Sequence, residues 1–126
     1  MSNGVILKAP EAESAAGADE TSVNVVRLVG RVCRVAEARS LPSGDEVWTL
    51  WVSVPDDRLR DGRRRVDVIA CTAWAGRAIR SLASWRLGDL VEVEGSLRHR
   101  FFKTGGGTAS RTEVEVRSAR LRSRAK

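Results

Sequence analysis

The chain has 126 residues, of which 22 are basic and 16 acidic, giving a net charge of +6. This length supports one domain with a single core, and no apolar stretch approaches the ~20 residues that a membrane-spanning helix needs. Residues 1–23 hold one basic and four acidic residues (net −3), whereas the remainder holds 21 and 12 (net +9). A basic field of this size favours polyanionic partners, unless the arginines serve only to keep the surface soluble.

The first 22 residues are predicted to form a disordered, acidic N-terminal tail. They are rich in Ala, Glu, Gly and Ser and have no lasting apolar period, so they cannot bury enough surface to become ordered. The apolar run at residues 5–7 is too short for the core of a signal peptide, and we therefore expect a cytoplasmic protein. The domain itself is expected over residues 23–121, followed by a short basic C-terminal tail at 122–126.

Two strands joined by a turn are predicted first. Residues 25–35 are β-branched, with arginines between the apolar positions, which indicates a long strand that bends near Gly30. Residues 41–45 contain a Pro-Ser-Gly turn signal. In the second strand, residues 47–54, alternation places Leu50 and three other apolar side chains on one face and Trp51 on the other.

A charged loop, a third strand and a helix are predicted next. Residues 55–65 contain several arginines and are interpreted as a loop, and the third strand is predicted over residues 66–74. Apolar residues between 76 and 87 are spaced for one face of a short helix that ends at Gly88.

The last two strands are predicted over residues 90–102 and 112–121, with a glycine-rich hairpin loop at 103–111. In the fourth strand, bulky apolar side chains point to one face while Arg98 and Arg100 point to the other. Five strands, with one short helix between strands three and four, fit an all-β fold: a five-stranded Greek-key barrel of the OB type. A sheet face that combines arginines with aromatic rings is typical of single-stranded nucleic-acid binding, because guanidinium groups neutralise phosphates while rings stack on unpaired bases.

Neither a catalytic site nor a metal site is predicted. Cys33 and Cys71 are an isolated pair, interpreted as small buried side chains in strands, with a disulfide as the less favoured alternative. His99, the only histidine, is expected to turn toward the core, and no nucleophile with an activating base is apparent. We therefore expect a protein that is not an enzyme, with no cofactor, metal or small-molecule substrate.

Five short segments stand in a familiar order along the chain. They are NVVRLVGRV in the first strand, LPSGDEV at the turn, CTAW at the end of the third strand, GDLVEVEGSLRHR in the fourth and TEVEV in the fifth. Together they resemble the signature blocks of the bacterial single-stranded DNA-binding protein family, over roughly residues 23–121. The resemblance implies an OB fold, usually assembled as a homotetramer, that coats single-stranded DNA without sequence preference in replication, repair or recombination.

The resemblance also suggests which rings stack on bases. Trp74 and Phe102 stand where the family commonly has stacking aromatics, whereas Val68 and Arg58 occupy positions that are often Trp. For Trp74, a role as a plug at the end of the barrel is the alternative. Trp51 lies on the face expected for nucleic acid, where the family usually has a small polar residue, and a place in a subunit interface is an equal alternative for it.

The end of the chain departs from the family pattern. Family members typically continue into a long tail tipped by acidic residues, which recruits repair enzymes, whereas this sequence ends SARLRSRAK, with five basic residues among its last ten. We therefore expect an accessory paralogue that does not recruit enzymes through an acidic tail, and whose C-terminal arginines add phosphate contacts.

The predicted function is sequence-independent binding of single-stranded DNA by a homo-oligomer. Aromatic rings on one face stack on the bases, and arginines on the same face contact the phosphates. The alternative is an OB-fold protein-interaction adaptor that has lost strong nucleic-acid binding, and this alternative gains if neighbouring glutamates neutralise the arginine face. The predicted nucleic-acid-binding residues are Trp51, Trp74, Phe102, Arg31, Arg34, Arg58, Arg63, Arg64, Arg65, Arg98, Arg100 and Lys103.

Overall fold

The computed structural model describes residues 21–60 and 63–126. It describes the side chains of these residues except those within 57–64. The predicted N-terminal tail therefore lies almost wholly outside the described residues. Five strands and one helix follow one another in the order β1 (Val26–Ser40), β2 (Glu46–Arg60), β3 (Arg63–Ala73), α1 (Gly76–Ser84), β4 (Leu90–Thr104) and β5 (Gly107–Ser123).

The strands close into a barrel in the order β1-β2-β3-β5-β4, because β1 pairs with both β2 and β4. Neighbouring strands are antiparallel except β3 and β5, which run parallel. The first part of β1, up to Arg31, pairs with β4, and from Arg31 onward β1 pairs with β2. The bend predicted near Gly30 lies at this exchange of partners. The predicted fold, a five-stranded OB barrel with one helix between β3 and β4, is confirmed.

The core follows from the alternation of apolar residues along the strands. Leu50 and Val52 of β2 and Val91 and Val93 of β4 are completely buried, and burying each such side chain contributes about 1.5–3 kcal/mol. Helix α1 packs its apolar face against the barrel through Leu82, which is also fully buried. These contacts form a packed core inside the barrel, and the other face of each strand points outward.

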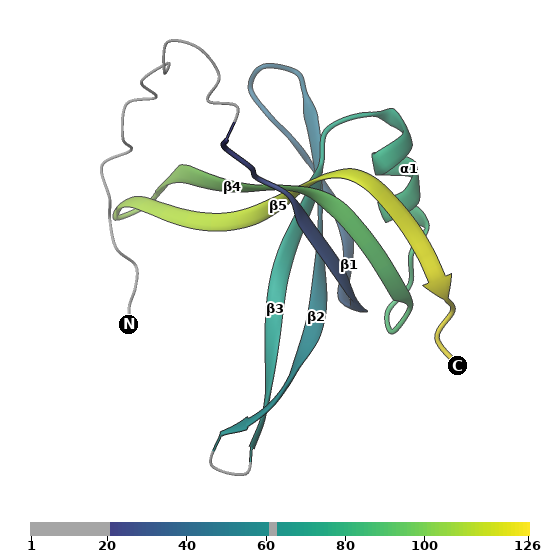
Figure 1. The fold of residues 1–126 in the computed structure, drawn as a ribbon. Coiled ribbons are helices and arrows are strands. Elements are labelled where there is room, and N and C mark those ends of the chain that lie inside the picture. The colour runs from purple at the N-terminus through teal and green to yellow at the C-terminus, as the bar shows by residue number, and fades with distance from the viewer. Residues whose placement is uncertain (1–20, 61–62) are drawn as a thin grey trace.

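The strands are longer than the sequence predicted, and two predicted loops are wrong. Strand β2 continues to Arg60 and β3 begins at Arg63, so most of the predicted loop 55–65 is strand. Most of the predicted loop 103–111 is likewise strand, since β4 and β5 are joined by a tight turn at Thr104–Gly107. Figure 1 shows the two hairpins projecting from the barrel as long arms. Their charged side chains hide the strand pattern, because an arm that leaves the barrel can be polar on both faces.

Two predictions about burial are also wrong. His99 is exposed and packs against the Phe101 ring, with 4.7 Å between the ring centroids, because the β4–β5 arm has left the barrel at this point. Cys33 is exposed because it follows the buried Val32 and points to the opposite face of β1. Cys71 is buried as predicted, and this burial raises the pKa of its thiol to about 12.

The C-terminal end of β5 is tied to the start of β4 by a buried carboxylate. Asp89 is 1% exposed and accepts hydrogen bonds from the backbone N–H groups of Arg86 and Ala125, each at 2.8 Å. The Arg124 guanidinium completes the set at 2.9 Å. Arg124, one of the C-terminal arginines expected to contact phosphates, is ion-paired with Asp89 on the barrel.

Replacing Asp89 by Asn is expected to loosen this end of the barrel. The two backbone hydrogen bonds and Arg124 hold the pKa of Asp89 below its usual range. The carboxylate therefore stabilises the fold above the unfolded-state pKa of about 3.9, and this stabilisation is lost as the pH falls through the lower folded-state pKa. We expect D89N to be less stable than the wild type at pH 7, with the difference shrinking below about pH 4.

Urea unfolding of both proteins between pH 2 and 7 measures this difference. E94Q removes an exposed carboxylate from the adjoining strand β4 and serves as the control, with stability at pH 7 expected to stay unchanged. A D89N deficit that stayed constant down to pH 2 would contradict the role given to the ionised carboxylate.

Candidate nucleic-acid interface

Three aromatic rings, two arginines and one glutamate gather near the place where β5 runs between β3 and β4. Alternation on β4 places Arg100 and Phe102 on one face, and the register of the arm sets Arg111 of β5 directly opposite Arg100. Trp51 comes from β2, and Trp74 directly follows β3. We call this group the Glu113 cluster; its members are Trp51, Trp74, Arg100, Phe102, Arg111 and Glu113.

Each ring of the cluster has a guanidinium group over it. The Arg100 Cζ atom lies 4.7 Å from the centroid of the Trp74 ring. The Arg111 Cζ atom lies 5.3 Å from the Trp51 centroid and 6.0 Å from the Phe102 centroid. Distances of up to about 6 Å are those of cation–π contacts. The cluster therefore presents flat apolar rings and positive charge side by side.

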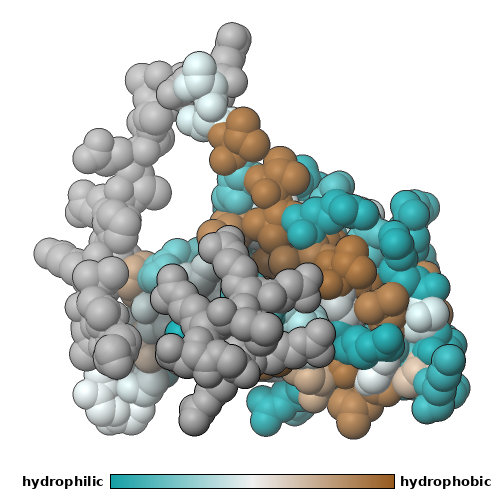
Figure 2. Space-filling view, turned by 60° about the horizontal axis from the view of Figure 1, so that its bottom comes forward, coloured by the Kyte–Doolittle hydropathy of each residue, from teal (hydrophilic) through white to brown (hydrophobic). Residues whose placement is uncertain are grey.

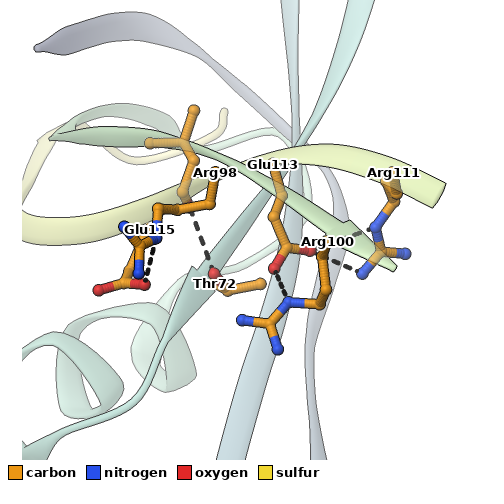
Figure 3. Close-up of polar contacts among 7 residues, drawn as sticks. Thr72, Arg98, Arg100, Arg111, Glu113 and Glu115 are labelled. Carbon is orange, nitrogen blue, oxygen red and sulfur yellow. Dashed lines mark hydrogen bonds and ion pairs between the residues drawn. The ribbon is translucent and has the colours of Figure 1, made fainter. Parts of the chain in front are cut away.

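Glu113 connects the two guanidinium groups through its carboxylate. Its carboxylate accepts from Arg100 Nε at 2.6 Å and from Arg111 Nη2 at 2.9 Å, and its side chain is only 1% exposed (Figure 3). The neighbouring pair, Arg98 and Glu115, is longer at 3.4 Å, with side chains 58% and 40% exposed. Pairing of the β4 arginines with glutamates thus occurs, but three arginines against two glutamates leave this face with a net positive charge.

Two adjoining hollows border the Trp51 ring, and both are also lined by Arg34. One has a volume of about 290 Å³ and is completed by Cys33 and Val68. The other, of about 360 Å³, is lined in addition by Glu37, Ala38, Arg39, Thr49 and Arg111. Val68 has no bulky ring that would fill the first hollow, and both hollows offer space beside Trp51 and Arg34.

The structure brings some of the predicted site residues together and separates others. Trp51, Trp74, Phe102 and Arg100 meet in the cluster, and Arg34 joins them through the hollows. Arg98 shares their face of β4 and pairs with Glu115.

The remaining predicted residues lie outside the cluster. Arg31 points away, since its Nη1 donates to the carbonyl oxygen of Gly88 at 3.1 Å. Arg65 and Lys103 are exposed on the two arms. The side chains of Arg58, Arg63 and Arg64 lie outside the described residues.

Sequence reasoning identified neither Arg111 nor Glu113 as a site residue, and it treated neighbouring glutamates only as groups that could neutralise the arginine face. Arg111 was placed in a loop because three consecutive glycines suggested a wide turn. A tight turn centred on Gly105 and Gly106 instead pairs Thr104 with Gly107, and counting outward from that pair sets Arg111 opposite Arg100. Arg100 and Arg111 are equally distant along the sequence from the turn at Gly105 and Gly106, and this equal spacing could have predicted that they pair.

Within the described ranges, no group of three or more His, Cys, Asp or Glu side chains could hold a metal ion. In the same part of the chain, no helix is long and apolar enough to cross a membrane.

Comparison with known proteins decides the family. The model of the single-strand binding protein family matches residues 23–122. The chain belongs to this family. Its OB barrel is also similar to a solved structure described as "Plasmodium falciparum SSB complex with ssDNA", with a TM-score of 0.66, 23% identity and coverage of 82% of this chain and 96% of that chain. At that identity, the likeness shows a shared fold.

Curated relatives in the single-strand binding protein family include proteins of streptococci. The chain is 36% identical over 102 residues to Single-stranded DNA-binding protein 1 of Streptococcus agalactiae serotype III (strain NEM316), covering 79% of this chain and 62% of that protein. It is 34% identical over 87 residues to the Single-stranded DNA-binding protein of Streptococcus pyogenes serotype M1, covering 68% and 53%. The chain therefore spans about half to three fifths of the length of these relatives.

Proposed function

We propose that this protein binds single-stranded DNA without regard to base sequence. The observation that carries the proposal is the Glu113 cluster, in which three rings and two guanidinium groups share one side of the barrel. Membership of the single-strand binding protein family supports it, as do relatives named as single-stranded DNA-binding proteins.

The mechanism is stoichiometric binding and not catalysis. Unpaired bases stack at Trp51, Trp74 and Phe102, on the ring or on the guanidinium plane that lies over it. Stacking contributes about 1–3 kcal/mol for each base, and every base has a flat face that can do so. Arg34, Arg100 and Arg111 contact the phosphates that lie between the bases. Duplex DNA is disfavoured because its bases are already paired and stacked on one another. Single strands are exposed in replication, repair and recombination, and we place the protein in these processes on the bacterial nucleoid.

Self-association is part of the proposal. Figure 2 shows hydrophobic residues forming a band across one face of the molecule. Among the described residues with large exposed hydrophobic side chains are Val23, Val25 and Leu97, at 81%, 61% and 47% exposed. The Asn24 side chain is hydrogen-bonded to both backbone groups of Leu97 at 2.8 Å, which places the two valines beside Leu97. Such neighbouring apolar side chains favour contact with a second copy of the chain.

Titration of the full chain with single-stranded oligo-dT, followed by intrinsic tryptophan fluorescence, tests the proposal. We expect strong quenching by the single strand and little by a duplex of the same length, because only unpaired bases reach the rings. Repeating the titration at two salt concentrations should show that log K falls with log[salt] by about 0.7 for each phosphate contact. Absence of both quenching and salt-sensitive binding would overturn the proposed function.

A protein-binding adaptor is the second candidate, and one observation favours it. Arg98, Arg100 and Arg111 form ion pairs with Glu113 and Glu115 within the chain. These carboxylates neutralise part of the positive charge of this face. If the titration showed no binding, the exposed rings would serve as a surface for a protein partner.

A further inference from the structure

We infer that Glu113 is a positioning residue that joins the two tryptophan sites of the single-strand interface into one rigid unit. It fixes Arg100 against the Trp74 ring and Arg111 against the Trp51 ring. The inference rests on the proposed function, and it assigns a role to a glutamate, a residue whose charge opposes DNA binding.

Burial makes the Glu113 contacts obligatory. A buried carboxylate is costly unless it is paired and hydrogen-bonded. With 1% of its side chain exposed, Glu113 depends on both arginines for its hydrogen bonds. Neither guanidinium group can therefore swing into solvent without leaving the carboxylate underpaired. Arg98 is held less firmly, because its partner Glu115 is 40% exposed and can be hydrated by water.

The fixed guanidinium groups keep free donors for a ligand. A guanidinium group has five N–H donors. Arg100 uses Nε toward Glu113, and Arg111 uses Nε and Nη2. About a third of each arginine side chain is exposed, 35% for Arg100 and 36% for Arg111. Phosphate oxygens can therefore reach the remaining donors, while bases stack on the rings or on the guanidinium planes.

One carboxylate thereby couples sites that come from different strands. Trp51 belongs to β2, Trp74 follows β3, and Glu113 lies on β5 between the two guanidinium groups (Figure 3). Binding would order two long arginine side chains if they were free, and ordering each side chain costs affinity. Glu113 removes this cost because both arginines are already in place in the free protein.

The sign of the effect of Glu113→Gln on affinity tests the inference. Removing a negative charge from a DNA-binding face should tighten binding, if charge alone mattered. If Glu113 positions the arginines, E113Q should instead weaken binding, by about fivefold or more. Each guanidinium group now donates to its own carboxylate oxygen, and Gln replaces one of these oxygens by an NH2 group, which would face a guanidinium N–H donor to donor. Glu115→Gln makes the same charge change two residues along β5, at an exposed pair, and should bind as well as the wild type or better.

Binding is measured as the anisotropy of fluorescein-labelled oligo-dT with the full chain, at one fixed salt concentration. Tryptophan emission of the ligand-free variants provides a second readout, because displaced arginines change the surroundings of Trp51 and Trp74. We expect a changed emission spectrum for E113Q and an unchanged one for E115Q. E113Q binding as tightly as E115Q or more tightly, with a folded circular dichroism spectrum, would overturn the inference.

Arg111→Lys keeps the inference testable if E113Q fails to fold. Arg111 is partly exposed, so the change is expected to leave the barrel intact. Lysine preserves the charge but lacks the planar fork that can bind Glu113 and lie over Trp51 at the same time. Weaker binding by R111K supports the inference, and unchanged binding overturns it. A wild-type protein that failed to bind in the same assay would overturn the proposed function, and is thus distinguishable from failure of the inference alone.

Discussion

Replacing Trp74 by Ala is expected to weaken the binding of single-stranded DNA by about 1–3 kcal/mol, or roughly 5- to 150-fold in Kd. The ring is half-buried and lies outside the buried core cluster of the barrel. It is also the surface on which Arg100 rests, with 4.7 Å between Cζ and the ring centroid. The variant therefore loses a base-stacking surface and a support for a phosphate contact, while the barrel stays folded.

Anisotropy of labelled oligo-dT at fixed salt measures this loss, with thermal melting as the check on folding. Trp48→Ala is the matched control. Trp48 is also a half-buried tryptophan, but it lies on the opposite face of β2 from Trp51 and its Nε1 donates to Glu46 at 2.8 Å. We expect W48A to change stability and not affinity. A folded W74A with unchanged affinity would remove Trp74 from the interface, and equal losses in both variants would indicate a general weakening of the barrel.

Alternation along single strands could be predicted from the sequence, and it determined the faces correctly on β2. Leu50 is fully buried while its neighbour Trp51 points to the opposite side. The reason is geometric: successive side chains of a strand point to opposite faces wherever the strand lies. The same rule put Cys33 outside and Cys71 inside, although the composition of the sequence had suggested that both cysteines were buried.

The contacts between strands could not be predicted, because they depend on turn length and register. Arg111 entered the site only because the turn at Gly105 and Gly106 is tight enough to continue the β4–β5 ladder to its tip. Burial of His99 was wrongly predicted for a related reason. Alternation shows that His99 and Arg100 point in opposite directions, but not that the side opposite Arg100, to which His99 points, is exposed to solvent here.

Net charge likewise does not show which arginines are available to a ligand. Residues 24–126 carry +9 by composition, yet Arg27 and Arg122 share Glu92, each at 2.7 Å, and Arg124 is bound to Asp89. Arginines held in such pairs stabilise the barrel and contribute less to steering of a polyanion. The position of the cluster, more than the total charge, is what makes one face suited to a nucleic acid.

Replacing Gly30 by Ala is expected to destabilise the fold by about 1–3 kcal/mol. Gly30 is buried where β1 changes partner from β4 to β2. A Cβ atom at this position would overlap the carbonyl oxygen of Ser53 and lie 2.8 Å from Cγ1 of Val52. Both neighbours belong to the β2 backbone or core, so neither can move without shifting the strand.

Thermal melting of G30A, compared with G76A, measures the cost of that close approach. A Cβ added at Gly76 meets no atom within 4 Å, so G76A should be neutral or stabilising by at most about 1 kcal/mol. Each 1 kcal/mol lost by G30A should lower Tm by about 4–8 °C in a domain of this size. An unchanged Tm would mean that β1 and β2 need not approach so closely. A lower Tm would show that the fold needs this close approach of β1 to Ser53, two residues from Trp51 on β2.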